Sequence, residues 1–92
     1  MSSASNNIMG NQVRAARALL HWNANDLAER SGVSLATIRR AEAVDGEPQT
    51  TAGNLKLLRM ALEAAGVEFI PENGGGPGVR LREPTKAAPS AG

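Results

Sequence analysis

The sequence predicts a mainly α-helical protein of four helices, with room for a fifth, followed by a short C-terminal β-hairpin. Three observations support this fold class. Apolar residues recur at helical spacing in several segments between residues 11 and 66. Residues that cap helices precede these segments, and glycines follow two of them. Beyond Gly66 the apolar pattern changes to partial alternation, which is typical of strands.

The N-terminal segment divides into an arm and a first helix. Residues 1–10, MSSASNNIMG, are small and polar and show no periodicity, so we expect a disordered arm. Val13, Ala16 and Leu20 then follow helical spacing, which predicts a helix over residues 11–22. Trp22 closes this helix.

Residues 23–42, NANDLAERSGVSLATIRRAE, predict two short helices joined by a tight turn, which is a helix-turn-helix. Asn23 can cap the first helix, with Asp26 three residues later completing a capping box. Gly32 ends this helix because glycine tolerates the left-handed conformation. Ser34 can cap the second helix, expected over residues 35–43.

The second helix of this motif has distinct inner and outer sides. Helical spacing places Ile38 and Ala41 on the inner side. The outer arc then combines two arginines with small or apolar residues: Leu35, Ala36, Arg39, Arg40 and Ala43.

The remaining helix and the hairpin follow from local signals. Residues 44–50 contain Asp45-Gly46 and Pro48 and predict a loop. Thr51 can cap a helix over residues 52–65, which completes a helix-turn-helix domain over residues 11–66. Two short strands, over residues 67–70 and 79–82, are connected by the glycine-rich loop PENGGGPG and form a hairpin over residues 67–82. Residues 83–92, rich in Pro, Ala and Ser, are expected to be a disordered tail.

The hairpin carries four apolar side chains that need a surface to pack against, because two strands alone are marginally stable in water. That surface is either the protein's own helices or a second subunit. We interpret the hairpin as a dimerisation element with interface residues Val67, Phe69, Val79 and Leu81.

Composition excludes several classes of function. The 92 residues allow one domain, and no apolar run approaches the roughly 20 residues that span a bilayer. With no cysteine and one histidine we expect no structural metal site, and the PENGGGPG loop is not a phosphate or dinucleotide fingerprint, so no cofactor is expected. The carboxylates fall on expected surface faces rather than in pairs, so we do not expect an enzyme.

Charge is distributed unevenly along the chain. Residues 1–43 carry five arginines and three acids, whereas residues 44–72 carry two basic residues and five acids. Positive charge therefore concentrates where the helix-turn-helix lies, as a surface that faces a polyanion requires.

The motif resembles the phage Cro and repressor family of DNA-binding proteins. Members carry an L-A-x-x-x-G-[VI]-S-x-x-x-I-x-x-x-E run, and the matching residues here are Leu27, Ala28, Gly32, Val33, Ser34, Ile38 and Glu42. The resemblance extends from about Val13 to Gly66, a little over half the chain. It implies a small lambda-repressor-like domain.

This resemblance also implies roles for individual residues. It implies an ion pair between Arg17 and Glu42, whereas the simplest interpretation of Arg14 is a solvated helix charge. The family places base contacts at the start of the second helix and one turn on, which here implies Leu35, Ala36 and Arg40, supported by Thr37. Phosphate contacts are expected from residues around this helix: Asn23, Asn25, Ser34, Arg39, Gln49 and Thr50.

We therefore expect a cytoplasmic regulator of transcription that binds a double-stranded DNA operator as a homodimer, with residues 35–43 in the major groove. The alternative is a protein-interaction module of antitoxin or antiactivator type, in which the same fold binds a partner protein. Salt-dependent binding to a short duplex favours the first class, and co-purification with a protein without DNA affinity favours the second.

Overall fold

The computed structural model describes residues 8–82, and its elements follow the order that the sequence predicts. They are α1 (Gly10–Leu20), α2 (Ala24–Ser31), α3 (Leu35–Glu42), α4 (Ala52–Ala64), β1 (Val67–Ile70) and β2 (Gly78–Leu81). The mainly α-helical domain with a two-stranded antiparallel hairpin is therefore confirmed. Four helices lie within the described residues, and the expected tail over residues 83–92 lies outside them.

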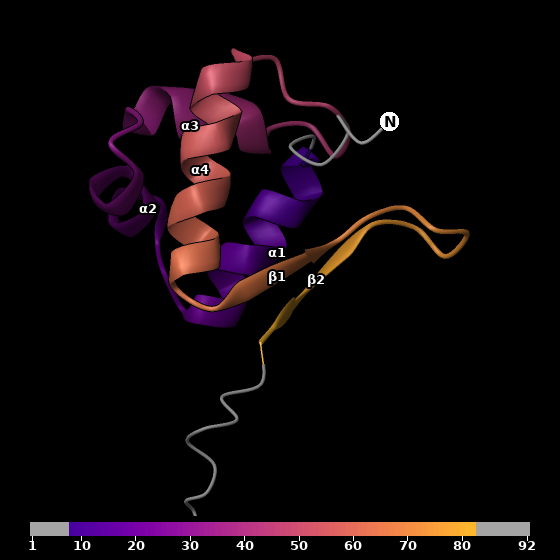
Figure 1. Cartoon of the computed structure of the whole chain (residues 1–92). Helices are drawn as coiled ribbons and strands as arrows, with labels where there is room; N and C mark the ends of the chain where they lie inside the picture. The colour runs from indigo at the N-terminus through magenta and orange to yellow at the C-terminus, as the bar shows by residue number, and fades with distance from the viewer. Residues whose placement is uncertain (1–7, 83–92) are drawn as a thin grey trace, which may run out of the picture.

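The core is aliphatic and draws on every helix. Val13 of α1, Leu27 of α2, Ile38 of α3 and Leu58 of α4 are all 0% exposed. Burying one such side chain contributes about 1.5–3 kcal/mol, so the cluster dominates the stability of a domain this small. Contacts of α2 with both α3 and α4 fix the motif to the rest of the molecule (Figure 1).

The chain just before α1 belongs to the core, which corrects the expectation of a disordered arm over residues 1–10 for its last three residues. Ile8 is 1% exposed and Gly10 is the first residue of α1. The N–H of Met9 donates to the side-chain oxygen of Gln12 (2.8 Å), which begins the helix. Long-range packing of Ile8 outweighs the polar composition of this segment. Residues 1–7 lie outside the described part of the chain.

Gly10 lies against the end of α3 and the following loop. Its N–H donates to the carbonyl of Gly46 (2.7 Å), and a Cβ atom here would meet the carbonyl oxygens of Ala41 (2.6 Å) and, more closely, Val44. Gly10→Ala should lower the free energy of unfolding by about 1–3 kcal/mol, because backbone atoms must move to admit the methyl group. Urea denaturation measures this. Gly53→Ala, which meets only the Thr51 hydroxyl oxygen at 3.9 Å, is the control, and equal effects of the two substitutions would contradict the prediction.

The first helix ends at Leu20, two residues earlier than predicted, because His21 adopts the left-handed conformation (φ 59°). The N–H groups of His21 and Trp22 donate to the carbonyls of Ala18 (3.1 Å) and Arg17 (3.0 Å). The turn brings Trp22 against the core, where it is partly buried, as expected of an anchor between the first two helices.

The hairpin pairs in the register Val67↔Leu81 and Phe69↔Val79, and it crosses α1 so that its connecting loop projects beyond the helices (Figure 1). The end of the ladder next to the loop is tied to α1 by the buried side chain of Gln12, whose amide donates to the carbonyl of Gly78 (2.9 Å). Contacts between α4 and β1 and between α1 and β2 make the sheet part of the same core.

None of the helices in residues 8–82 is long and apolar enough to cross a lipid bilayer.

Candidate nucleic-acid interface

The helix-turn-helix is built from local caps. The side chain of Asn23 accepts from the N–H of Asp26 (2.8 Å), and the Asp26 carboxylate accepts from the N–H of Asn23 (2.9 Å). This is the predicted capping box. Gly32 ends α2 in the left-handed conformation (φ 79°), and Val33, 4% exposed, anchors the turn in the core. The turn between α2 and α3 is therefore fixed at both ends.

Helix α3 is capped by Ser34, whose hydroxyl oxygen accepts from the N–H of Thr37 (3.1 Å) and whose hydroxyl donates to the Thr37 hydroxyl oxygen (2.9 Å). The two hydroxyl groups that lie nearest the start of the helix are thus bonded to each other. The hydroxyl proton of Ser34 is therefore already used and is not available to a phosphate, and the Thr37 hydroxyl oxygen has one lone pair fewer for a base.

The inner and outer sides of α3 match the predicted pattern. Ile38, Ala41 and Glu42 are buried. The outward arc consists of exposed residues: Ala36, Arg39, Arg40 and Ala43. Leu35 and Thr37 are half-buried at its margins. Neither Arg39 nor Arg40 forms an ion pair within residues 8–82, so both guanidinium groups are free to meet an anion.

The predicted pair between Arg17 and Glu42 is present, and it joins α1 to the end of α3. Nε and Nη2 of Arg17 donate to the two carboxylate oxygens of Glu42 at 2.7 and 2.8 Å, and Nη1 donates to the carbonyl of Trp22 (2.9 Å). Glu42 is only 9% exposed. The hydrogen bond to Glu42 and its negative charge raise the pKa of Arg17 against the opposing effect of burial. The arginine is therefore a positioning residue for α3.

Arg14, one helical turn before Arg17, also holds the end of α3. Its guanidinium donates to the carbonyls of Glu42 (2.6 Å) and Val44 (3.2 Å) and to the carboxylate of Asp45 (2.5 Å). Arg14 is therefore not the solvated helix charge that we expected. Its partners lie about 30 residues away along the chain, where local patterns give no signal.

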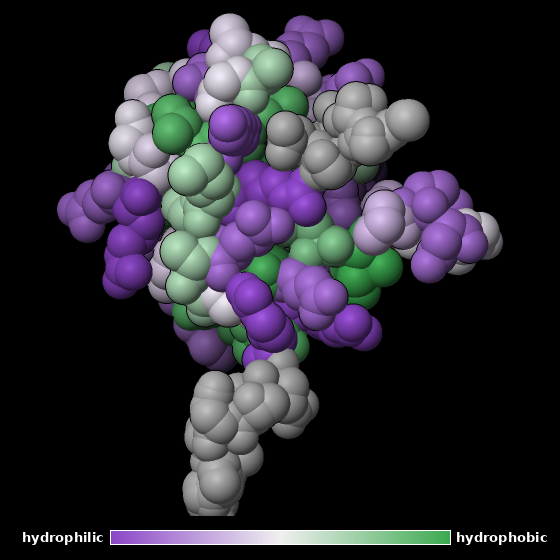
Figure 2. Space-filling view, in the orientation of Figure 1, coloured by the Kyte–Doolittle hydropathy of each residue, from purple (hydrophilic) through white to green (hydrophobic). Residues whose placement is uncertain are grey.

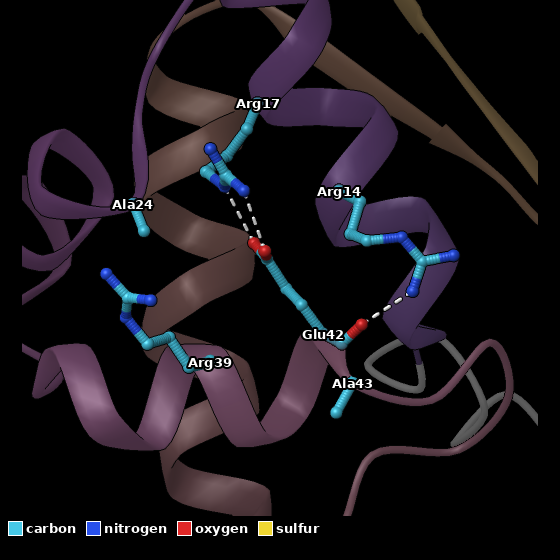
Figure 3. Close-up of a pocket in the computed structure, with 6 residues that line it drawn as sticks. All are labelled: Arg14, Arg17, Ala24, Arg39, Glu42 and Ala43. Carbon is cyan, nitrogen blue, oxygen red and sulfur yellow. Dashed lines mark hydrogen bonds and ion pairs between the residues drawn. The ribbon is translucent and has the colours of Figure 1, made fainter.

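These residues border a hollow of about 450 Å³ between α1, the start of α2 and α3. Its lining contains three arginines, one carboxylate and two alanines: Arg14, Arg17, Arg39, Glu42, Ala24 and Ala43 (Figure 3). Figure 3 shows Arg39 extending from α3 toward Ala24 at the start of α2. Because Arg17 pairs with Glu42 and Arg14 with Asp45, the lining charge left without an ion pair within residues 8–82 is the positive charge of Arg39. The hollow can accept an anionic group such as a phosphate.

The other expected phosphate contacts are divided between two places. Asn23 and Asn25 are exposed at the start of α2, beside the hollow. Gln49 and Thr50 lie in the loop before α4 and do not line it. Gln49 is exposed, whereas Thr50 is half-buried and its hydroxyl oxygen accepts from the side chain of Asn54 (3.0 Å).

Most of the hairpin residues assigned to a dimer interface pack against the protein's own core. Val67 is 0% and Phe69 9% exposed, and Val79 packs partly against the same core. The assignment of Val67 and Phe69 to the interface is therefore wrong, because the protein's own helices cover that face of β1. Leu81 remains 47% exposed.

Among the described residues, no three His, Cys, Asp or Glu side chains cluster in a way that could hold a metal ion. Comparison of the sequence with models of protein families found no match, and neither did comparison with curated proteins.

Proposed function

We propose that the protein is a sequence-specific double-stranded DNA-binding regulator of transcription, of the Cro/repressor type that its motif resembles. The observation that carries the proposal is the outward arc of α3, which presents two free arginines beside two alanines at the rim of a basic hollow. A major groove about 12 Å wide admits one α-helix, and small outward side chains let the helix approach the base edges closely. Action on DNA places the protein in the cytoplasm.

The arrangement of charge supports this orientation. With α3 in the major groove, Arg39 and the start of α2 lie toward one phosphate backbone, where the hollow can hold a phosphate group. Arg17 and Arg14 keep α3 at a fixed angle to α1 through their bonds to Glu42. Because the recognition helix is already held in place, binding costs little conformational entropy.

Selection of bound fragments from genomic DNA tests this function. The expected result is a short palindromic sequence, bound with an affinity that falls as salt rises, because phosphate contacts release counterions. The same affinity for the selected duplex and for a scrambled one at two salt concentrations would contradict sequence-specific binding.

We further propose that the protein binds as a homodimer through the outer edge of β2. The backbone N–H of Arg82 donates to the carbonyl of Gly66 (2.6 Å), so these two residues form a hydrogen-bonded pair of the ladder. Hydrogen-bonded and non-hydrogen-bonded pairs alternate in an antiparallel ladder, which makes Leu81 and Val79 members of non-hydrogen-bonded pairs. Their backbone N–H and C=O groups therefore point away from β1. In Figure 1 no helix or strand of residues 8–82 lies beyond this edge. A second β2 strand related by a two-fold axis can pair there, with the exposed Leu81 side chains covered.

Leu81→Asp should weaken dimerisation while leaving the helical circular dichroism unchanged, because Leu81 is 47% exposed in the single chain. Light scattering over a concentration series should give the mass of a monomer for this variant at concentrations where the parent protein is a dimer. Met60→Asp, on α4 and 53% exposed, is the matched control and should remain dimeric. Loss of the dimer only with Met60→Asp would place the interface on α4 instead.

A second class of function, a protein-interaction module of antitoxin or antiactivator type, is favoured by a separate observation. Leu57 and Met60 of α4 are 43% and 53% exposed, and Figure 2, seen from the side of α4, shows apolar surface over this helix. In Figure 3 α4 lies behind the hollow, so a protein bound to it would leave α3 free. Co-purification with a partner and no affinity for any duplex would favour this class.

A further inference from the structure

The outward arc of α3 has an ordered pattern of side chains. At about 100° per residue, Ala36 and Ala43 lie within about 20° of each other and form a ridge along the helix. Arg40 lies about 40° to one side of Ala36, and Arg39 about 60° to the other side, toward the hollow. All four residues are exposed. The helix therefore presents methyl groups along its centre and one guanidinium on each side.

The four exposed side chains of this arc include no hydrogen-bond acceptor. Guanidinium groups only donate, and alanine has no polar side-chain atom. At the margin of the arc, the Ser34 hydroxyl donates to the hydroxyl oxygen of half-buried Thr37, which occupies one of the two lone pairs of that oxygen. The carboxylate of Glu42 is buried and bound at both oxygens by Arg17. The exposed arc of α3 can therefore form two kinds of contact with a base edge: hydrogen bonds donated by a guanidinium group, or an apolar contact.

The base edges in the major groove differ in the donors, acceptors and methyl groups that they present to a protein. Guanine presents two acceptors, which suit a guanidinium fork. Adenine presents one acceptor, N7, beside an amino donor, and cytosine presents an amino donor; only the amino groups need an acceptor on the protein. Thymine presents a methyl group at C5, which needs an apolar contact, and cytosine methylated at C5 presents the same group.

We propose that α3 reads guanine acceptors together with the C5-methyl groups of neighbouring pyrimidines, and that it recognises an A·T pair from its thymine rather than from the amino group of adenine. This inference rests on the proposed function and specifies which chemical groups of the operator carry its sequence. Arg40 supplies the guanine contact, and Ala36, with Leu35 at the margin of the arc, supplies the methyl contact.

A consequence is that methylation of cytosine at C5 changes operator affinity. Where the ridge faces the methyl group of a thymine, 5-methylcytosine on the same strand restores the apolar contact that cytosine lacks. Covering one methyl group is worth about a fourfold change in affinity.

Base analogues test the inference with the unaltered protein. In the selected duplex each thymine is replaced singly by uracil, which keeps the base pair and removes only the methyl group. At least one position per half-site should lose about fourfold in affinity. A cytosine placed at that position should bind better when methylated at C5, and 7-deazaguanine at the guanine that Arg40 contacts should weaken binding.

The variant Ala36→Gly assigns the contact. If Ala36 covers the methyl group, this variant should bind the thymine and uracil duplexes equally. The control Ala64→Gly, at an exposed alanine of α4, should retain the preference for thymine. Specific binding of the operator with no effect of any uracil would overturn this inference and leave the proposed function standing. Absence of specific binding to any duplex would overturn both.

Discussion

Replacing Arg17 by alanine is expected to lower the free energy of unfolding by about 3–5 kcal/mol. The reason is the position of its partner, since the carboxylate of Glu42 is 9% exposed and both of its oxygens accept from Arg17. Without the guanidinium this charge stays largely buried and unpaired. The carbonyl of Trp22 loses a donor at the same time.

A double-mutant cycle by urea denaturation measures this pair. Arg17→Ala and Glu42→Ala should each destabilise the protein, and the double variant should lose less than the sum of the two. Glu68→Ala, which removes the exposed pair with Arg80 on the hairpin, is the control and should have a much smaller effect. Additive losses at Arg17 and Glu42 would show that the two side chains do not stabilise each other.

Local signals in the sequence predicted the helix-turn-helix well because each acts within one turn of the chain. Asn23, Ser34 and Thr51 each accept from the N–H three residues later, as their positions before apolar segments predict. Gly32 has the left-handed conformation that its place after α2 requires. Caps and glycine turns depend on neighbouring residues alone, so no knowledge of the tertiary fold is needed to find them.

Contacts between segments far apart in sequence were not predictable in this way. Ile8 follows a polar stretch and is nevertheless in the core. Gly10 was predicted as part of the disordered arm, because nothing in its neighbouring residues shows that it packs against the carbonyls of Ala41 and Val44. Gln12 likewise belongs to a residue type that is usually exposed. It is buried here because the fold brings the Gly78 carbonyl within reach of its amide.

The hairpin shows a second feature that the sequence does not predict, which is the surface against which its apolar face packs. Alternation predicted both strands, and it correctly put Val67 and Phe69 on an apolar face, but it does not say what covers that face. The contacts of β1 with α4 and of β2 with α1 settle this in favour of the protein's own helices. The candidate site shows the same division: the arc of α3 follows from helical spacing, whereas the role of Arg14 at its end depends on the packing of α1.

The largest effect on binding is expected for Arg40→Ala. Arg40 is exposed on the side of the Ala36–Ala43 ridge away from the hollow, and its guanidinium fork matches the two acceptors of guanine in the major groove. Loss of one such contact costs roughly 1–3 kcal/mol, and the proposed homodimer would lose it in both half-sites, which gives roughly 2–6 kcal/mol. The variant should also lose its preference at one base pair in each half-site.

Arg39→Ala is the matched comparison, because Arg39 is the neighbouring residue and equally free of ion pairs within residues 8–82. Its side chain extends toward the start of α2 (Figure 3), which the proposed docking turns toward the phosphate backbone. This variant should weaken binding to operator and scrambled duplexes alike and reduce the dependence of affinity on salt. Titrations of both variants on both duplexes at two salt concentrations separate the roles. An Arg40→Ala protein with full affinity and unchanged base preference would show that another residue reads the operator.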